Sequence, residues 1–278
     1  MNFQLAAFRL GNQLGSIFTP ARTVKKAGTL FLTPNRYDIK DWEVQAEKDG
    51  QRFNINKDIS AIRWSNPKPD GEKASKQILL VHGWESRATQ MYGVAQQLLT
   101  TGYDVVAIDM PAHGHSKGQT SNPHLFAQTI QLAQQYLGNF EVIVGHSMGA
   151  GATAIAVGRG VSTQKMVLIS GPSSIENVLR RFAGFIGLNK SGVNKFVEFI
   201  SSIVGSTPQD LDTQLLLKNS TIPTLIIHDE QDLEIPVSES KRLASVLKNG
   251  QLILSKNLGH RKILKSPEIM QKIVSFIK

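Results

Sequence analysis

Residues 141–157 read EVIVGHSMGAGATAIAV, and this stretch decides the fold. Its first four residues form a short apolar run typical of a buried strand, and Ala150 to Val157 continue as an alanine-rich helical pattern. Between them, Gly145-His146-Ser147-Met148-Gly149 has the form G-x-S-x-G. In a strand–turn–helix context this spacing puts the serine on a sharp, strained turn, where small flanking residues relieve crowding. We therefore predict that Ser147 presents its hydroxyl at the end of a strand.

Short apolar runs alternate with helical patterns on both sides of this stretch. Such alternation is typical of a parallel sheet with crossover helices on its faces. We predict an α/β fold with a mostly parallel, doubly wound sheet, which binds ligands at the carboxyl ends of its strands. The other predicted strands are Gln77 to Val81, Val105 to Asp109, Met166 to Ser170, Thr224 to His228 and Gln251 to Leu254. The predicted helices are Ala88 to Thr101, His124 to Leu137, Ser147 to Gly158, Ser238 to Lys248 and Ser266 to Ile277.

A serine nucleophile needs a histidine base, and a carboxylate that orients the base. The run Thr224 to His228 is followed by a loop with four carboxylates: Asp229, Glu230, Asp232 and Glu234. The last strand run is followed by Leu258-Gly259-His260, and His260 is the one histidine of the sequence downstream of the acidic loop. The order serine, acid, histidine is the order that this architecture requires.

From about Gln77 to Lys278 the sequence resembles the α/β-hydrolase superfamily, in particular its serine-nucleophile esterase-like and lipase-like members. The resemblance implies the α/β-hydrolase fold and a catalytic triad of Ser147, Asp232 and His260. Residues 228–236, HDEQDLEIP, resemble the family's G-x-x-D-x-x-V-P loop with Asp232 as the acid. Asp229 is the alternative acid if the loop is shifted.

Two further motifs carry the same resemblance. His82-Gly83-Trp84 resembles the family's H-G-x turn, which implies that the Trp84 and Met148 backbone N–H groups form the oxyanion hole. Around them we expect His82, Gly83 and His146 to line the substrate pocket. Residues 109–116, DMPAHGHS, resemble the family's D-x-P-G-H-G-x-S loop, which supports the fold more than the activity.

The chain divides into four parts. Residues 1–40 form an N-terminal extension, residues 41–170 the first part of the hydrolase core, and residues 223–278 its second part. The interval 171–222 is too long for a simple crossover, and its apolar residues recur at helical spacings, so we predict a small helical cap inserted between two late strands. Asp41 to Ser65 alternates polar and apolar residues around Asp49-Gly50, which predicts an antiparallel hairpin or meander.

The segment from Met1 to Phe18 predicts a short amphipathic helix. It lacks a positively charged start and contains Arg9, which argues against an export signal. We expect its apolar face to pack on the core, with peripheral lipid contact as the alternative. Because no stretch reaches roughly 18 apolar residues, we expect no transmembrane segment and a cytoplasmic location. The residues of this face are Phe3, Ala6, Ala7, Leu10, Leu14 and Phe18.

Composition excludes several classes of function. There is no cysteine, hence no disulfide framework, thiolate metal site or cysteine nucleophile. Lys and Arg number 31 against 22 Asp and Glu, a net charge of +9. The basic residues are scattered rather than interleaved with aromatics, so we expect no nucleic-acid partner. We expect no metal and no cofactor, and the sequence leaves the oligomeric state open.

These observations favour hydrolysis of carboxylic esters with short to medium acyl chains. The mechanism would be acyl transfer through an acyl-enzyme, and the partner a small-molecule ester. Lysophospholipase, monoacylglycerol lipase-like, thioesterase and carbon–carbon hydrolase activities share the same triad and stay open. A ligand-binding protein on a hydrolase fold is the non-enzymatic alternative.

Overall fold

A computed structural model describes residues 3–66 and 76–278. In that part of the chain eight strands form one sheet in the order β1-β2-β4-β3-β5-β6-β7-β8. Strands β3 to β8 run parallel, while β2 is antiparallel to both β1 and β4. The strands are β1 Gln51–Asn54, β2 Ser60–Trp64, β3 Gln77–Val81, β4 Asp104–Ile108, β5 Phe140–His146, β6 Thr163–Ile169, β7 Thr224–Asp229 and β8 Gly250–Ser255.

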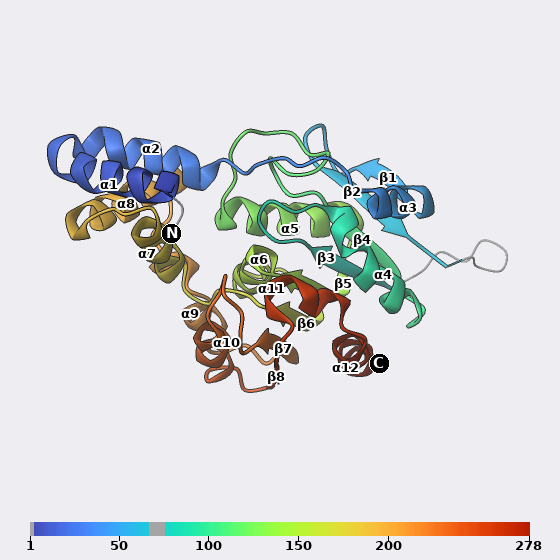
Figure 1. Ribbon diagram of the computed structural model, residues 1–278. Helices are drawn as coiled ribbons and strands as arrows, with labels where there is room; N and C mark the ends of the chain where they lie inside the picture. The colour runs from blue at the N-terminus through green and yellow to red at the C-terminus, as the bar shows by residue number, and fades with distance from the viewer. Residues whose placement is uncertain (1–2, 67–75) are drawn as a thin grey trace.

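Helices cover both faces of this sheet (Figure 1). The α-helices are α1 Phe3–Phe18, α2 Pro20–Leu32, α3 Asp41–Asp49, α4 Tyr92–Leu99, α5 Pro123–Leu137, α6 Met148–Gly158, α7 Ile175–Phe185, α8 Lys190–Val204, α9 Thr213–Leu217, α10 Val237–Ala244, α11 Gly259–Lys262 and α12 Pro267–Ile277. Short 3-10 helices are η1 Ala88–Met91, η2 Gln209–Leu211 and η3 Ile263–Lys265. The predicted α/β fold with a mostly parallel, doubly wound sheet is confirmed.

Each face of the sheet has its own apolar core. Side chains alternate between the faces along a strand, so Leu79 and Val81 of β3 lie in one core and Ile78 and Leu80 in the other. Helices α5 and α6 contribute to the first core and α4 and α12 to the second. The central strands are therefore apolar on both sides, which is why they appear in the sequence as continuous apolar runs.

The antiparallel pairing predicted between Asp41 and Ser65 is present, as β1 with β2, but its predicted turn at Asp49-Gly50 is wrong. Asp41–Asp49 is helix α3, and the turn lies between β1 and β2. Two side chains of α3 are fully buried: Ala46, and Glu43, which accepts a 2.7 Å hydrogen bond from the Thr89 hydroxyl. This tertiary contact outweighs the alternating pattern that suggested a strand.

Helices α7, α8 and α9, called here the inserted helices, lie between β6 and β7 in the chain. Helices α1 and α2 lie against α8 at one end of the molecule, and Phe31 of α2 packs on Phe182 of α7 (Figure 1). Gly28 of α2 and Phe199 of α8 mark a tight contact, since an added Cβ at Gly28 would lie 2.4 Å from the Phe199 ring. The four-part division of the chain, with a cap over the strand ends, stays a prediction.

The N-terminal helix α1 forms as predicted, but its expected packing is wrong. Phe3, Leu10, Leu14 and Phe18 of its apolar face are exposed to solvent. Pro20 is the first residue of helix α2, a position where proline is favoured.

After α2, a segment called here the strap, residues 33–40, runs back across the loops at the strand ends. Asn35 donates to Glu85 Oε1 through its backbone N–H at 3.0 Å and its side-chain amide at 2.7 Å, and the Tyr37 hydroxyl donates to Glu85 Oε2. The Arg36 guanidinium donates to the backbone oxygens of Gly114 and Ser116 at 2.8 and 2.7 Å. The strap therefore holds two strand-end loops together.

One buried carboxylate attaches the inserted helices to the core. Glu239 of α10 accepts hydrogen bonds from the Ser173 N–H and hydroxyl, the Ser174 N–H, the Asn177 amide and the Arg181 guanidinium. Burial by itself would raise the pKa of Glu239, but hydrogen bonds, above all from Ser173, Arg181 and Asn177, lower it from 4.5 to about 2. The ionised form is therefore favoured by folding.

We expect Glu239→Gln to destabilise the protein by about 3 kcal/mol at pH 7, because a folded-state pKa below the unfolded value stabilises the fold wherever the carboxylate is ionised. That stabilisation is fully present above the unfolded pKa of about 4.5 and is lost as the pH falls toward 2. The difference between variant and wild type should thus shrink steadily below pH 4.5. Urea unfolding from pH 7 to pH 3 measures this difference in unfolding free energy.

Glu268→Gln, at an exposed side chain of α12, is the control and should change the unfolding free energy little. A gap that stays constant over this pH range would contradict the prediction.

Candidate active site

Ser147 sits on a strained turn where β5 passes into α6. Its φ of 55° lies in the left-handed region, which costs a non-glycine residue on the order of 1–3 kcal/mol. Its N–H donates to the Ile169 carbonyl of β6 at 2.8 Å. Helix α6 begins at the next residue, Met148, so its positive end lies beside the serine. This is the geometry expected from the G-x-S-x-G spacing.

The turn is possible because its flanking glycines leave room for the backbone. An added Cβ at Gly145 would lie 2.5 Å from the Gly149 carbonyl oxygen. An added Cβ at Gly149 would lie 2.3 Å from the Val81 carbonyl oxygen and 2.5 Å from that of His82. Helix α6 therefore starts in direct contact with the end of β3.

The acidic loop and the C-terminal histidine come together as a hydrogen-bonded pair. His260 Nδ1 lies 2.7 Å from Asp232 Oδ2, and both side chains are buried. The other oxygen of Asp232 accepts the N–H groups of Glu234 and Ile235 at 2.8 and 2.9 Å. Burial would raise the pKa of Asp232, but hydrogen bonds from His228, His260 and the Ile235 N–H hold it well below its usual range. Asp232 is thus an anion that fixes the imidazole.

The alternative acid, Asp229, is occupied elsewhere. It accepts hydrogen bonds from the Ser255 hydroxyl at 2.8 Å and from the Leu258 and Gln231 N–H groups at 3.0 Å. These bonds join the acidic loop to the loop that carries His260. Asp229 therefore positions the pair, while Asp232 contacts the ring.

His146 connects this pair to the serine turn. Its Nε2 lies 2.8 Å from the His260 carbonyl oxygen, and the two imidazole rings are 4.9 Å apart. Burial lowers the pKa of His146 to about 3, so the ring is neutral at physiological pH. Because Ser147 directly follows His146, the serine turn and the His260 loop lie at the same edge of the sheet.

The loop 82–84 lies on the other side of the serine. An added Cβ at Gly83 would lie 2.9 Å from Ser147 Cβ, so the backbone passes directly against the serine. His82 is fully buried, accepts the Met110 N–H at 3.0 Å through Nε2 and donates to the Gly83 carbonyl through Nδ1 at 2.7 Å. Burial lowers its pKa to about 4. With both ring nitrogens hydrogen-bonded to the backbone, His82 holds the loop in place, and its predicted place in a substrate pocket stays a prediction.

This arrangement brings two backbone N–H groups of the predicted oxyanion hole to adjacent segments. Trp84 follows Gly83, and Met148 is the first residue of α6. The Trp84 ring packs edge-on against His113 at 5.1 Å between centroids. The strap contacts the next residue, Glu85, whose φ is 54°.

A family model described as the alpha/beta hydrolase family matches residues 78–249. The chain belongs to the alpha/beta hydrolase family. The matched region contains the serine turn, the 82–84 loop and Asp232, while His260, α1 and α2 lie outside it.

Individual proteins match this chain at low sequence identity or over a small part of its length. A serine hydrolase-like protein of Dictyostelium discoideum is 33% identical over 103 residues, which are 35% of this chain and only 27% of that protein. A monoacylglycerol lipase of Mycolicibacterium smegmatis is 23% identical over 71% of this chain and 84% of its own length. Among solved structures, Est1E from Butyrivibrio proteoclasticus with ferulic acid bound has a TM-score of 0.66 at 16% identity, covering 82% of this chain and 97% of that one. This last likeness concerns the fold alone.

One residue that contacts the Asp232–His260 pair was not singled out by the sequence. The Nε2 of His228 lies 2.9 Å from the Ile235 carbonyl oxygen and 3.3 Å from Asp232 Oδ2. Its Nδ1 lies 2.6 Å from the Ser240 hydroxyl. Because a carbonyl oxygen only accepts, Nε2 carries the proton, and Asp232 has a second imidazole N–H beside it.

Among the described residues, 3–66 and 76–278, no group of three or more histidine, aspartate and glutamate side chains is arranged to hold a metal ion. In the same part of the chain no helix has the length and apolarity needed to cross a bilayer.

We expect Gly149→Ala to destabilise this hydrolase-family protein by about 1–3 kcal/mol, because the new methyl group meets backbone oxygens that cannot move aside cheaply. Gly93→Ala is the matched control. Gly93 lies inside α4 with no atom near an added Cβ, so the same substitution should stabilise the protein by about 0.5–1 kcal/mol. Thermal unfolding of both variants measures the difference. Equal effects of the two substitutions would show that the contact between α6 and β3 is not tight.

Proposed function

We propose that the protein is a serine hydrolase that cleaves carboxylic esters of short to medium acyl chains. The observation that carries this proposal is the 2.7 Å Asp232–His260 pair beside the strained Ser147 turn. Acyl transfer needs a serine next to an imidazole that activates it, and a buried carboxylate that orients the imidazole. The proposal includes the triad of Ser147, Asp232 and His260.

In the proposed mechanism His260 acts as the general base. Its Nδ1 is held by Asp232, which leaves Nε2 to take the proton of the Ser147 hydroxyl. The serine oxygen attacks the ester carbonyl, and His260 gives the proton to the departing alcohol. Water then attacks the acyl-enzyme with the help of the same imidazole, which releases the acid and restores Ser147.

Charge develops at two places during these steps. The Trp84 and Met148 N–H groups would bind the oxyanion, a contribution of about 10²–10³ in rate for each such donor. The imidazolium formed on His260 is stabilised by Asp232, and Glu234 Oε2 lies 3.7 Å from Nε2. Neutral His82 and His146 add no opposing positive charge next to it.

The names of relatives support ester chemistry but not one substrate. A monoacylglycerol lipase is among them, at 23% identity. Lysophospholipase or monoacylglycerol lipase activity is the second candidate, because the exposed apolar residues of α1 are a feature that suits a lipid substrate. Thioester hydrolysis uses the same residues and is distinguished by assay.

Steady-state hydrolysis of p-nitrophenyl esters of increasing chain length tests the proposal. We expect turnover by the wild type, a loss of about 10⁴-fold or more in kcat for Ser147→Ala and His260→Ala, and about 10³–10⁴-fold for Asp232→Asn, which holds the wrong tautomer. The chain length with the highest kcat/KM measures the acyl site. Parallel assays with monoacylglycerol, lysophospholipid and acyl thioesters separate the alternatives.

Two controls sharpen this experiment. His115→Ala, at a partly exposed histidine of the 109–116 loop, should retain activity, since His115 contacts neither Ser147 nor Asp232 in the described structure. A fluorophosphonate probe should label the wild type and the His115→Ala variant but not Ser147→Ala. Absence of both labelling and turnover in a folded wild type would overturn the proposal and favour a ligand-binding role.

A further inference from the structure

Helix α1 is amphipathic, but it is turned so that its more polar side faces the protein. Ser16 is buried, and its hydroxyl lies 2.8 Å from where a Cβ at Gly192 of α8 would stand. The Asn12 amide donates to the Ile186 carbonyl at 2.8 Å. Since residues four apart lie on one side of a helix, Asn12 and Ser16 mark the side that contacts the inserted helices.

The opposite side of α1 carries large apolar side chains in solvent. Along a helix, positions 3, 7, 10, 14, 17 and 18 fall together on the side away from Asn12 and Ser16. We call these residues the outer stripe: Phe3, Ala7, Leu10, Leu14, Ile17 and Phe18. Phe3, Leu10, Ile17 and Phe18 are 85%, 56%, 59% and 77% exposed.

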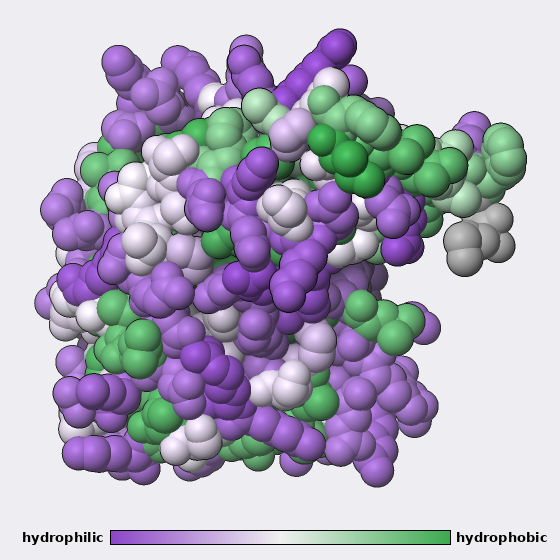
Figure 2. All heavy atoms as spheres, turned by 90° about the vertical axis from the view of Figure 1, so that its left-hand side faces the viewer, coloured by the Kyte–Doolittle hydropathy of each residue, from purple (hydrophilic) through white to green (hydrophobic). Residues whose placement is uncertain are grey.

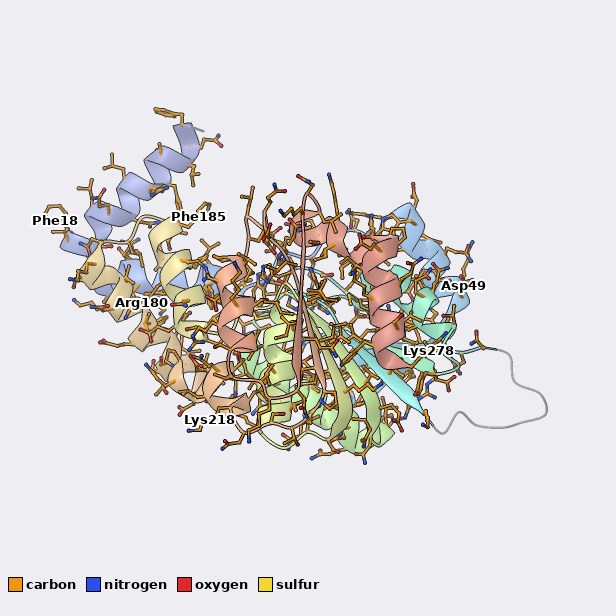
Figure 3. The ribbon with its side chains drawn as sticks, turned by 90° about the horizontal axis from the view of Figure 1, so that it is seen from below. Phe18, Asp49, Arg180, Phe185, Lys218 and Lys278 are labelled. Atoms are coloured by element: carbon orange, nitrogen blue, oxygen red, sulfur yellow. The ribbon has the colours of Figure 1, made fainter. Side chains whose placement is uncertain are left out.

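The outer stripe is continuous and prominent. Figure 2 shows apolar side chains as a green band at the upper right of that face. Figure 3 shows α1 standing out from the rest of the molecule, with Phe18 at its last turn. An apolar surface of this kind on a protruding helix is a sign of an interaction site.

Helix α1 and the helices next to it are rich in basic residues. Helices α1, α2, α7 and α8 contain eight basic residues and only two acidic ones, Glu176 and Glu198, so they carry +6 of the +9 net charge. On α2 the exposed side includes Arg22, Lys25 and Lys26, while Val24 and Ala27 are buried. No Asp or Glu occurs before residue 38.

We propose that the outer stripe of α1 docks into the headgroup region of an anionic lipid bilayer, with the helix lying in the plane of the surface. An amphipathic helix with apolar residues on one side and basic residues nearby is the arrangement that binds such surfaces. Its 16 residues span about 24 Å, long enough to lie along the surface. This proposal concerns binding and does not depend on the proposed catalytic activity.

The charge decides between a bilayer and a second copy of the chain. A symmetric dimer through the outer stripe would bring two sets of helices with +6 each into contact, and like charges oppose such an interface. An anionic lipid surface is complementary to the same helices. The strap, which follows α2 directly, would then hold the docked helices in a fixed relation to the loop of Trp84.

Vesicle co-sedimentation tests the proposal with the full chain. We expect binding to vesicles of phosphatidylcholine mixed with phosphatidylglycerol, and much weaker binding to phosphatidylcholine alone. The triple substitution Arg22→Gln, Lys25→Gln and Lys26→Gln should weaken binding to the anionic vesicles by about a hundredfold. Equal binding to both kinds of vesicle would contradict the electrostatic part of the proposal.

A pair of neighbouring variants isolates the apolar part. Leu14→Glu and Gln13→Glu add the same charge at adjacent exposed positions, but only Leu14 belongs to the outer stripe. We expect Leu14→Glu to bind at least about tenfold more weakly than Gln13→Glu, with unchanged thermal unfolding and unchanged hydrolysis of a water-soluble ester.

Two results would overturn the proposal. One is equal vesicle affinity for the Leu14→Glu and Gln13→Glu variants. The other is a wild type that does not bind anionic vesicles but forms a dimer in analytical ultracentrifugation. If Leu14→Glu dissociates that dimer, the outer stripe is an interface between copies of this chain.

Discussion

The close contact between the start of α6 and the end of β3 is the constraint on which the candidate site depends. Gly149 lies against the Val81 and His82 carbonyl oxygens, and Gly83 lies against Ser147. Ser147 adopts a left-handed conformation in this turn, and such a conformation persists only where the surrounding structure stabilises it. The same contact holds the loop that leads to Trp84 against the turn that leads into Met148. One packing contact therefore positions all the residues proposed to act as nucleophile and oxyanion donors.

Several buried histidine side chains lie at the same edge of the sheet, and burial affects their pKa values. It lowers the pKa of His82 to about 4 and those of His113 and His146 to about 3, so these rings serve as neutral hydrogen-bonding and packing groups. His260 and His228 differ because Asp232 contacts both: its carboxylate lies 2.7 Å from His260 Nδ1 and 3.3 Å from His228 Nε2. The neutral His146 ring lies 4.9 Å from the His260 ring.

Much of this could be predicted from the sequence because the information is local. The strand β5, the glycine-flanked serine and the helix α6 are consecutive, and the parallel strands appear as apolar runs. What failed depends on distant contacts. The sequence of helix α3 has the pattern of a strand, and the helix is stabilised by the contact of Glu43 with Thr89, which is distant in the sequence. The periodic pattern in α1 predicts an apolar side but does not predict whether other parts of the protein cover that side. The role of His228 required the position of Ser240 and the Ile235 carbonyl, which no spacing encodes.

The strap gives the first part of the chain a consequence for how this fold can be divided. The family match begins at residue 78, yet Asn35 and Tyr37 hold Glu85, and Arg36 holds the 114–118 loop. A fragment cut at the edge of the match would lose the outer support of the residue that follows Trp84, together with β1 and β2. The smallest part of this chain that keeps these contacts is therefore longer than the matched family region. A chimeric protein built from it has to include the strap.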